Sequence, residues 1–288
     1  MAIMTAKAPG KLRTLRGNPA FIAAVALMFI IIVPGLVASL VMEKDAVRIM
    51  AGPPNSLPSR EHLLGTQSEG RDVLSLLLVG TPSTLMIGLI GGCVGVIIGV
   101  TLGLISGFVG GRTDTIIRTV VDVGLTIPSL AILILIAASF RGMTLSLMGL
   151  VVAITAWMHS ARTIRSQVLS LRERNFVLLA RLSGAKDRHL IFQEIMPNLI
   201  PYIASSFVDA VSTAILASIG LEVLGLGPQK AQTLGNTIYF AIFYSAMWRG
   251  LWWWWLPPIL ILIGIFVALF LLSISLDEFA NPRLNRAS

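Results

Sequence analysis

The chain has 288 residues, of which 55% are hydrophobic and only 12% are charged, and its formal net charge is +8. Soluble globular domains carry about 25% charged residues, so this composition excludes an ordinary soluble protein and indicates a chain embedded in lipid. The cations lie between apolar runs, without the aromatic and basic clusters of a nucleic-acid groove, so we expect no nucleic acid as a partner.

Six apolar stretches are long enough to cross a bilayer, which takes ~17–25 residues in a helix. They comprise residues 20–42, 83–106, 119–140, 143–159, 200–222 and 254–276. The first follows a basic stretch and is too long for the core of a signal peptide, so we interpret it as an uncleaved anchor. The predicted fold class is an all-α integral membrane protein with six transmembrane helices.

The positions of Lys and Arg predict the orientation of these helices. If the N-terminus is cytoplasmic, 15 of the 22 Lys and Arg residues fall on the inner side. Because positive residues accumulate on the cytoplasmic side of membrane proteins, we expect both termini to be cytoplasmic.

A polar segment, residues 43–82, follows the first span on the expected external side. It contains Pro53, Pro54 and Pro58 and is therefore not one continuous helix. Gly65 and Gly70 indicate a defined turn within it. Arg71 and Asp72 have two interpretations: a solvated helix cap, or a surface that closes an external gate or docks a partner.

Small residues mark one face of the second predicted span. Gly91, Gly95, Gly99 and Gly103 repeat every four residues, which places them on one side of a helix. We expect this face to pack against protein rather than lipid. Cys93, the only cysteine of the chain, lies in the same run, and we interpret it as a small buried residue.

Two carboxylates fall in or near apolar runs, where a charge costs ~2.5–3.5 kcal/mol on insertion scales. We place Asp122 in the first turn of the third span, near the interface, where the helix dipole stabilises it. Asp209 lies midway along the fifth span. It is a candidate for the transport pathway or for contact with a partner subunit, and a structural role stays open.

Tryptophans cluster before the last span, at Trp248 and at residues 252–255. Such a cluster is typical of the aromatic belt at a membrane interface. The alternative is a stacking platform for a sugar at the external mouth. On that interpretation Trp252 and Trp253 are pathway candidates.

The sequence offers no sign of chemistry of its own. His62, His159 and His189 share no metal-ligand spacing, and no phosphate-binding G-x-x-x-x-G-K-[ST] motif is present. No paired base and nucleophile suggests a membrane-embedded enzyme. We therefore predict no catalytic residue, no metal site and no bound cofactor.

The expected cytoplasmic segment, residues 160–199, is too long for a simple turn and carries seven cations. Asn175 predicts a helix start and Gly184 predicts its end. Three apolar residues at helical spacing form one face of this helix: Phe176, Leu179 and Leu182. A second short helix is predicted from about Lys186 to Met196, stopped by Pro197.

This segment resembles the signature of the membrane subunits of ATP-binding-cassette importers, E-A-A-x-x-x-G followed after nine residues by I-x-L-P. The positions at the signature spacing are Ala180, Gly184 and Pro197, with Met196 in place of the leucine. The remaining signature positions differ and hold Leu178, Leu179 and Glu194.

A longer motif narrows the resemblance. The run H-L-L-G-T-Q-S-E-G-R-D-V-L-S, at His62–Ser75, is similar to the L-G-T-D-x-x-G-R-D-V-L-S motif of the C-type subunit of the oligopeptide and dipeptide permease branch. Gln67 replaces its aspartate. Shorter matching motifs lie at Gly107–Asp114, Val120–Leu130, Leu221–Gly227 and Asn281–Leu284.

The resemblance implies the six-helix fold of a type I importer permease in the bacterial plasma (inner) membrane. Its implied partners are a second, different permease subunit, two ATPase subunits that bind ATP and magnesium, an external substrate-binding protein and membrane lipid. The implied organisation is a cytoplasmic N-terminus (1–19), a first helix with an external segment (20–82) and a permease domain (83–285) that contains the coupling segment 160–199.

The resemblance also assigns roles to residues. Coupling to an ATPase would involve Ala180, Gly184, Ala185, Lys186, Asp187, His189, Glu194, Pro197 and Asn198. The external gate or the docking of the binding protein would involve Gly65, Thr66, Gly70, Arg71 and Asp72.

The implied cargo is a short peptide, with an oligosaccharide or nickel as the alternative. A different class of function is a stand-alone secondary transporter or channel. Such a protein would not need the coupling segment, and the chain lacks the internal repeats that secondary transporters often have.

Overall fold

The computed structural model describes residues 18–41 and 47–280, and these form helices joined by turns, without a strand. The helices in chain order are α2 (Pro19–Val41), α3 (Val73–Val109), α4 (Gly111–Thr126), α5 (Ser129–Ala138), α6 (Leu145–Arg172), α7 (Asn175–Leu182), α8 (Asp187–His189), the π-helix η2 (Leu190–Ile195), α9 (Met196–Val223), α10 (Leu234–Phe243) and α11 (Trp252–Ala280).

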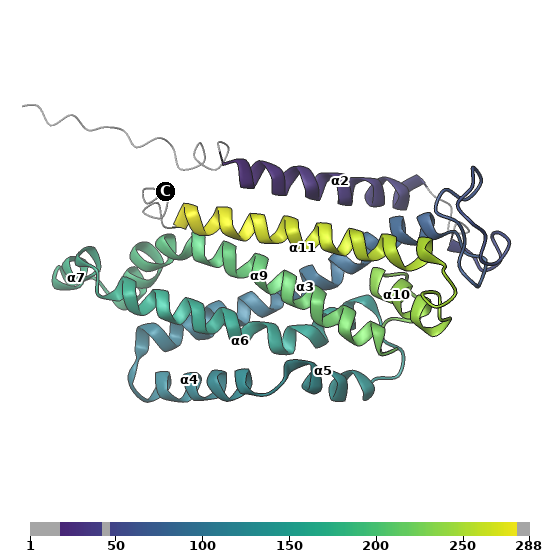
Figure 1. The fold of residues 1–288 in the computed structure, drawn as a ribbon. Helices are drawn as coiled ribbons and strands as arrows, with labels where there is room; N and C mark the ends of the chain where they lie inside the picture. The colour runs from purple at the N-terminus through teal and green to yellow at the C-terminus, as the bar shows by residue number, and fades with distance from the viewer. Residues whose placement is uncertain (1–17, 42–46, 281–288) are drawn as a thin grey trace, which may run out of the picture.

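The long helices lie side by side along one axis of the molecule (Figure 1). Helix α3 is central and packs most extensively against α6 and α9, while α2 packs on α11 at one side. The α4–α5 pair lies on the opposite side. Helix α7 projects at one end, here termed the α7 end, and α10 lies at the other, the α10 end.

The first and last long helices are tied together at the α7 end. The Asn18 side chain donates a hydrogen bond from Nδ2 to Oε2 of Glu278, at 2.7 Å. Helix α2 therefore begins, and α11 finishes, on the side of the molecule from which α7 projects.

The predicted fold class is confirmed. Within the described residues, five helices are long and apolar enough to cross a membrane, and α4 with α5 makes a sixth when this bent pair is taken as one span. The bend between α4 and α5 is 84°. It falls at Pro128, which disfavours helical backbone at the residue before it, and Ile127 is extended.

Helix α3 begins at Val73, ten residues before the start that the sequence predicted. The carboxylate of Asp72 caps this end by accepting a hydrogen bond from the backbone N–H of Ser75, at 2.8 Å. Pro82 sits inside the helix rather than before it. The irregular external segment is shorter than expected by the same ten residues.

The predicted stop at Pro197 is wrong, because the chain continues as helix from Asp187 to Val223. The π-helical turn η2 ends at Ile195, two residues before this proline. A proline ring clashes with the carbonyl four residues earlier in a regular α-helix, and here that carbonyl belongs to Gln193 of the π-helical turn. Pro197 therefore lies in the first turn of α9.

The glycine face of α3 packs on protein, as predicted. A Cβ at Gly95 would lie 2.9 Å from the Cβ of Ala156, and one at Gly103 would lie 2.8 Å from the carbonyl oxygen of Ala161. Both contacts are with α6. Cys93 corrects our interpretation, because it is exposed on the surface of the chain rather than buried.

We expect Gly99→Val to prevent correct packing of α3 on α6. A Cβ at this position would lie 2.6 Å from the Ser160 Cβ and 2.7 Å from the Trp157 carbonyl oxygen. Overpacking of this kind costs ~1–3 kcal/mol. Thermal unfolding of the detergent-solubilised protein should show this loss of stability as a lower unfolding temperature. The control, Cys93→Val on an exposed position of the same helix, should unfold like the wild type; equal stability of the two variants would contradict this contact.

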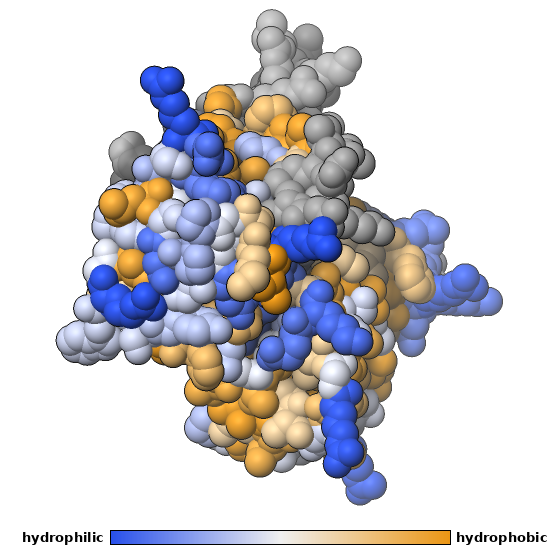
Figure 2. Space-filling view, turned by 90° about the vertical axis from the view of Figure 1, so that its right-hand side faces the viewer, coloured by the Kyte–Doolittle hydropathy of each residue, from blue (hydrophilic) through white to orange (hydrophobic). Residues whose placement is uncertain are grey.

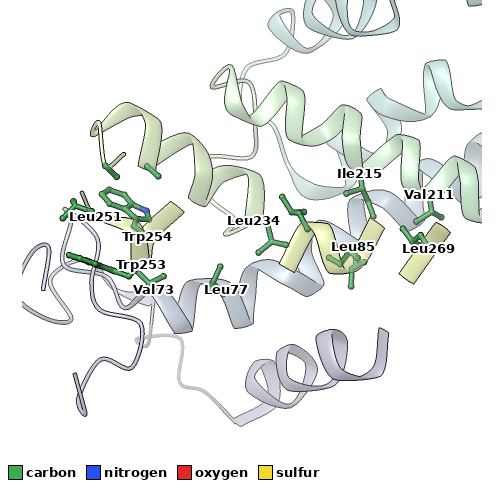
Figure 3. Close-up of a cluster of buried hydrophobic side chains, with 14 of the residues drawn as sticks. Val73, Leu77, Leu85, Val211, Ile215, Leu234, Leu251, Trp253, Trp254 and Leu269 are labelled. Atoms are coloured by element: carbon green, nitrogen blue, oxygen red, sulfur yellow. The ribbon is translucent and has the colours of Figure 1, made fainter. Parts of the chain in front are cut away.

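The core at the α10 end joins α3, α9, α10 and α11 (Figure 3). The indole of Trp254 is fully buried there, beside Leu251 and close to Val73 at the start of α3. Leu234, at the start of α10, packs between these helices. A shared hydrophobic core therefore holds α10 against α3, α9 and α11.

Candidate functional site

At the α7 end, the chain presents an exposed apolar knob that is held in place from behind. Val177 is fully buried and packs with Ile164, Leu190 and Leu199. On the outer side, Leu182 is 85% exposed, and Leu179 is 63% exposed. We call the exposed residues Phe176, Leu178, Leu179, Leu182 and Phe192 the apolar knob.

The turn after α7 fixes the orientation of this knob. Gly184 has φ +82°, in the left-handed region that favours glycine. The backbone N–H of Gly184 donates to the Arg181 carbonyl, and that of Ala185 donates to the Ala180 carbonyl, at 3.0 and 3.1 Å. This is the Schellman pattern of helix ends. Helix α7 begins at Asn175, as predicted, but Arg174 occupies the N-cap position and no side chain caps this end.

The structure brings five of the nine predicted coupling residues together in one groove: Ala180, Gly184, Ala185, Lys186 and His189. An open groove of about 880 Å³ is lined by nine residues: Ala180, Ser183, Gly184, Ala185, Lys186, Arg188, His189, Phe192 and Gln193. Asp187, Pro197 and Asn198 are exposed nearby along the chain. Glu194 is half-buried, with Oε1 3.8 Å from Nε2 of His189, and its carbonyl accepts a hydrogen bond from the Asn198 side chain.

The predicted external site is largely engaged in internal contacts. Gly65 and Gly70 have φ +65° and +70°, which confirms a defined turn. Thr66 is fully buried, and its hydroxyl donates to the Pro53 carbonyl. Asp72 caps α3 and contacts His62 Nδ1 at 3.1 Å. The structure therefore favours the cap interpretation of Asp72 over a docking surface.

Charged residues fasten this segment to the turn that follows α10. Arg71 pairs with Glu69 at 2.9 Å, and both side chains are mostly buried. The Tyr244 hydroxyl donates to the Glu69 carboxylate at 3.3 Å. Burial and the neighbouring Glu69 charge raise the pKa of Tyr244, so the phenol keeps the proton that it donates. Hydrophilic side chains gather over this end of the molecule, with apolar ones between and below them (Figure 2).

The tryptophans of the α10 end divide into two groups. Trp248 and Trp252 are exposed, by 91% and 50%. Trp253 is 4% exposed, and its indole N–H donates to the Thr66 carbonyl at 3.3 Å. Trp253 is therefore a packing residue, and its assignment to the pathway is wrong.

An open pocket lies between the helices, and the exposed side chain of Asp209 lines it. Its volume is about 200 Å³, and its walls come from α4, α5, α6 and α9. The pocket is lined by Leu125, Ser129, Thr155, Ala156, His159, Ser160, Thr163, Ser206, Asp209, Ala210 and Thr213. Because an ionisable residue is costly in contact with lipid, the Asp209 carboxylate makes this pocket the candidate for the transport pathway.

A network of ion pairs, which the sequence analysis did not foresee, holds α4 on α6. Arg162 donates to Asp122 at 2.7 Å, and Arg165 donates from NH2 to Asp114 at 2.7 Å. Arg118 also contacts Asp122, at 3.3 Å. Asp122 lies late in α4 rather than in its first turn, so its partners are arginines and not a helix N-terminus. The signal available in the sequence was the pair of arginines three residues apart on α6.

A buried carboxylate at the α10 end of α9 was also missed. Glu222 is 1% exposed, and its Oε2 accepts a hydrogen bond from the Thr233 hydroxyl at 2.5 Å. The other oxygen, Oε1, has no hydrogen-bond partner within the described residues. Leu234, which follows Thr233, donates its backbone N–H to Thr84 of α3 at 2.9 Å. Glu222 thus links α9 to the start of α10.

Proteins with related sequences are permeases. The chain is 32% identical over 171 residues to the oligopeptide transport system permease protein OppC of Bacillus subtilis, which covers 59% of this chain and 55% of OppC. The match therefore spans little more than half of that relative. The dipeptide transport system permease protein DppC of the same organism is 27% identical over 277 residues, 95% of this chain and 85% of DppC.

A solved structure shares the fold. It is a chain of the MetNI methionine ABC transporter in inward-facing conformations, with a TM-score of 0.56 and 17% sequence identity. The similarity covers 72% of this chain and 95% of that one. At this identity the likeness concerns the arrangement of helices.

The family follows from a profile described as "Binding-protein-dependent transport system inner membrane component", which matches residues 99–286. These residues include the last part of α3 with Gly99 and Gly103, the pocket at Asp209, the apolar knob and α11. The chain belongs to this family of binding-protein-dependent transport components of the inner membrane.

Proposed function

We propose that this chain is the membrane-spanning pathway subunit of an ATP-driven importer and that its cargo is a short peptide. The family supports the importer role. The names of the two relatives, an oligopeptide permease and a dipeptide permease, support the cargo. Oligosaccharide or nickel transport has no comparable support among these relatives.

In this proposal the chain performs no ATP chemistry itself. Two ATPase subunits bind ATP and magnesium, a second and different permease completes the pathway, and an external binding protein delivers the peptide. The α7 end faces the cytoplasm with both chain termini, and residues 160–199 form the coupling segment. The α10 end faces the binding protein.

The apolar knob is the observation that supports this proposal most. A side chain such as Leu182, 85% exposed on a short helix at the end of the molecule, is costly in water unless a partner covers it. Helix-in-groove docking buries such a face. The knob is joined through η2 to α9, so movement of a docked partner would tilt a helix that runs the length of the molecule.

The test is ATP hydrolysis by the complete transporter in lipid vesicles. The chain is reconstituted with the second permease, the ATPases and the binding protein, and short peptides are added, and oligosaccharides in a parallel sample. We expect hydrolysis to rise with peptides and not with oligosaccharides. Stimulation by oligosaccharides alone would overturn the peptide assignment. A chain that never associates with an ATPase would overturn the importer role.

A further inference from the structure

The pocket around Asp209 lies where the bend of the α4–α5 pair faces α6 and α9. Leu125, near the end of α4, and Ser129, at the start of α5, form one wall. Six of its eleven lining residues carry a hydroxyl group, on a surface that is otherwise mostly apolar: Ser129, Thr155, Ser160, Thr163, Ser206 and Thr213. A discontinuous span near a transport site is a common way to present polar groups inside a membrane.

The pocket carries one acidic side chain and no basic one. Asp209 is its only carboxylate, His159 is its only other titratable residue, and neither Lys nor Arg lines it. Oδ1 of Asp209 accepts a hydrogen bond from Ser273 of α11 at 2.8 Å. No cation pairs with this carboxylate within the described residues, and the side chain is exposed to the pocket. Its remaining acceptor positions are open to a ligand.

Most of the neighbouring positive charge is already paired with other carboxylates. Three arginines line the adjacent pocket: Arg165 pairs with Asp114, while Arg118 and Arg162 share Asp122, which leaves one positive charge in excess there. The end of α4 and the start of α5 meet at Pro128, so their opposite dipole ends largely offset each other. Because Asp209 is the charged residue that lines the pocket itself, we expect a negative electrostatic potential there.

We propose that this pocket is a cation-accepting subsite of the pathway and that it takes the α-ammonium group of the peptide cargo. An ammonium has three N–H donors and no acceptor, which suits a pocket lined by one carboxylate and several hydroxyl oxygens. A volume of about 200 Å³ fits one terminal residue of a peptide rather than a whole ligand. This inference rests on the proposed function for the identity of the cargo. The negative charge of the site does not depend on that function.

The sign of the site is tested with charged thiol reagents. Cys93 is the only cysteine, so Cys93→Ser gives a background without thiols in this chain. Thr213→Cys then places a thiol in the pocket, and Ser139→Cys places one on an exposed residue outside it. In the assembled transporter, we compare the reaction rates of aminoethyl methanethiosulfonate, a cation, and sulfonatoethyl methanethiosulfonate, an anion.

We expect the cation-to-anion rate ratio to be about tenfold higher at position 213 than at position 139, because the carboxylate concentrates cations locally. Adding Asp209→Asn should bring the ratio at position 213 down to that of position 139. Asp209→Glu should retain the preference. A ratio that does not respond to Asp209→Asn would overturn the subsite.

The ammonium assignment is tested on the same thiol. A short peptide with a free amino terminus, delivered at saturating binding protein, should slow the labelling at position 213, whereas its N-acetylated form should not. Equal protection by both forms would overturn the assignment. Failure of the proposed function is separate, since it appears as absent peptide stimulation of ATP hydrolysis in the unmodified transporter.

Discussion

Gly184→Val is expected to abolish peptide-stimulated ATP hydrolysis while the protein still inserts and folds in the membrane. Gly184 has φ +82°, and a left-handed conformation costs an L-residue about 1–2 kcal/mol, more for a β-branched one. A Cβ there would meet no atom within 4 Å, so the strain is confined to the turn. Relief of this strain must change the Schellman turn and with it the direction of the apolar knob.

Two controls separate conformation from side-chain bulk. Gly184→Asn should keep most of the stimulation, because asparagine tolerates the left-handed region better than other side chains. Gly142→Val carries the same substitution at φ +83°, also in open space but between α5 and α6, away from the knob. It should leave coupling intact.

The measurement is ATP hydrolysis with and without peptide, together with co-purification of the ATPase subunits. A strain of this size predicts roughly a tenfold or greater loss of stimulation. Leu182→Asp should also lose ATPase binding, since this side chain is 85% exposed and contributes little to the fold. Wild-type stimulation in the Gly184→Val transporter would refute the role given to this turn.

The sequence predicts those features of the fold that depend on residues close together in the chain, and not those that depend on contacts between distant segments. The glycine face of α3 was predicted because a four-residue repeat is a local property of one helix. The start of α3 was placed ten residues late, because the apolar run from Val73 follows a polar segment and contains Pro82. Only the contact of Asp72 with Ser75 shows that the helix begins there.

The candidate sites divide in the same way. The turn at Gly184 follows from a local rule and was predicted. The burial of Trp253 depends on the Thr66 carbonyl, 187 residues away, and no local pattern reveals it. The pairs of Asp114 and Asp122 with α6 and the burial of Glu222 likewise require the packing of separate helices. Asp209 was found because a carboxylate in an apolar run is rare.

The length of the helix from Asp187 to Val223 gives the molecule a route between its two ends. At its start, this helix carries η2 and the groove that Gly184 lines. Its other end lies beside α10. At the α10 end, Glu222 accepts a hydrogen bond from Thr233, and the next residue, Leu234, donates to Thr84 of α3. A tilt of this helix relative to α3 must therefore strain or break one of these two hydrogen bonds. Contacts at the two ends of this helix would thus act on the same packed element, which is a physical basis for coupling between the two ends.

Glu222→Ala is expected to destabilise the α10 end by about 2–4 kcal/mol, because it removes a buried side chain and leaves the Thr233 hydroxyl without its acceptor. The side chain is packed tightly, since a Cβ at Gly235 would overlap its carboxylate. We expect peptide stimulation of ATP hydrolysis to fall strongly, while basal hydrolysis and ATPase binding at the distant α7 end persist.

Glu222→Gln is the matched control for this link. No cation pairs with Glu222 within the described residues, and an amide oxygen can accept the Thr233 hydroxyl as the carboxylate does. The glutamine variant should therefore keep wild-type thermal stability and stimulation, measured by unfolding in detergent and by ATP hydrolysis in vesicles. If alanine were as well tolerated as glutamine in both measurements, the link between α9 and α10 would carry no coupling. If glutamine were as harmful as alanine, the negative charge itself would be required, and packing and hydrogen bonding alone would not explain why the chain buries this residue.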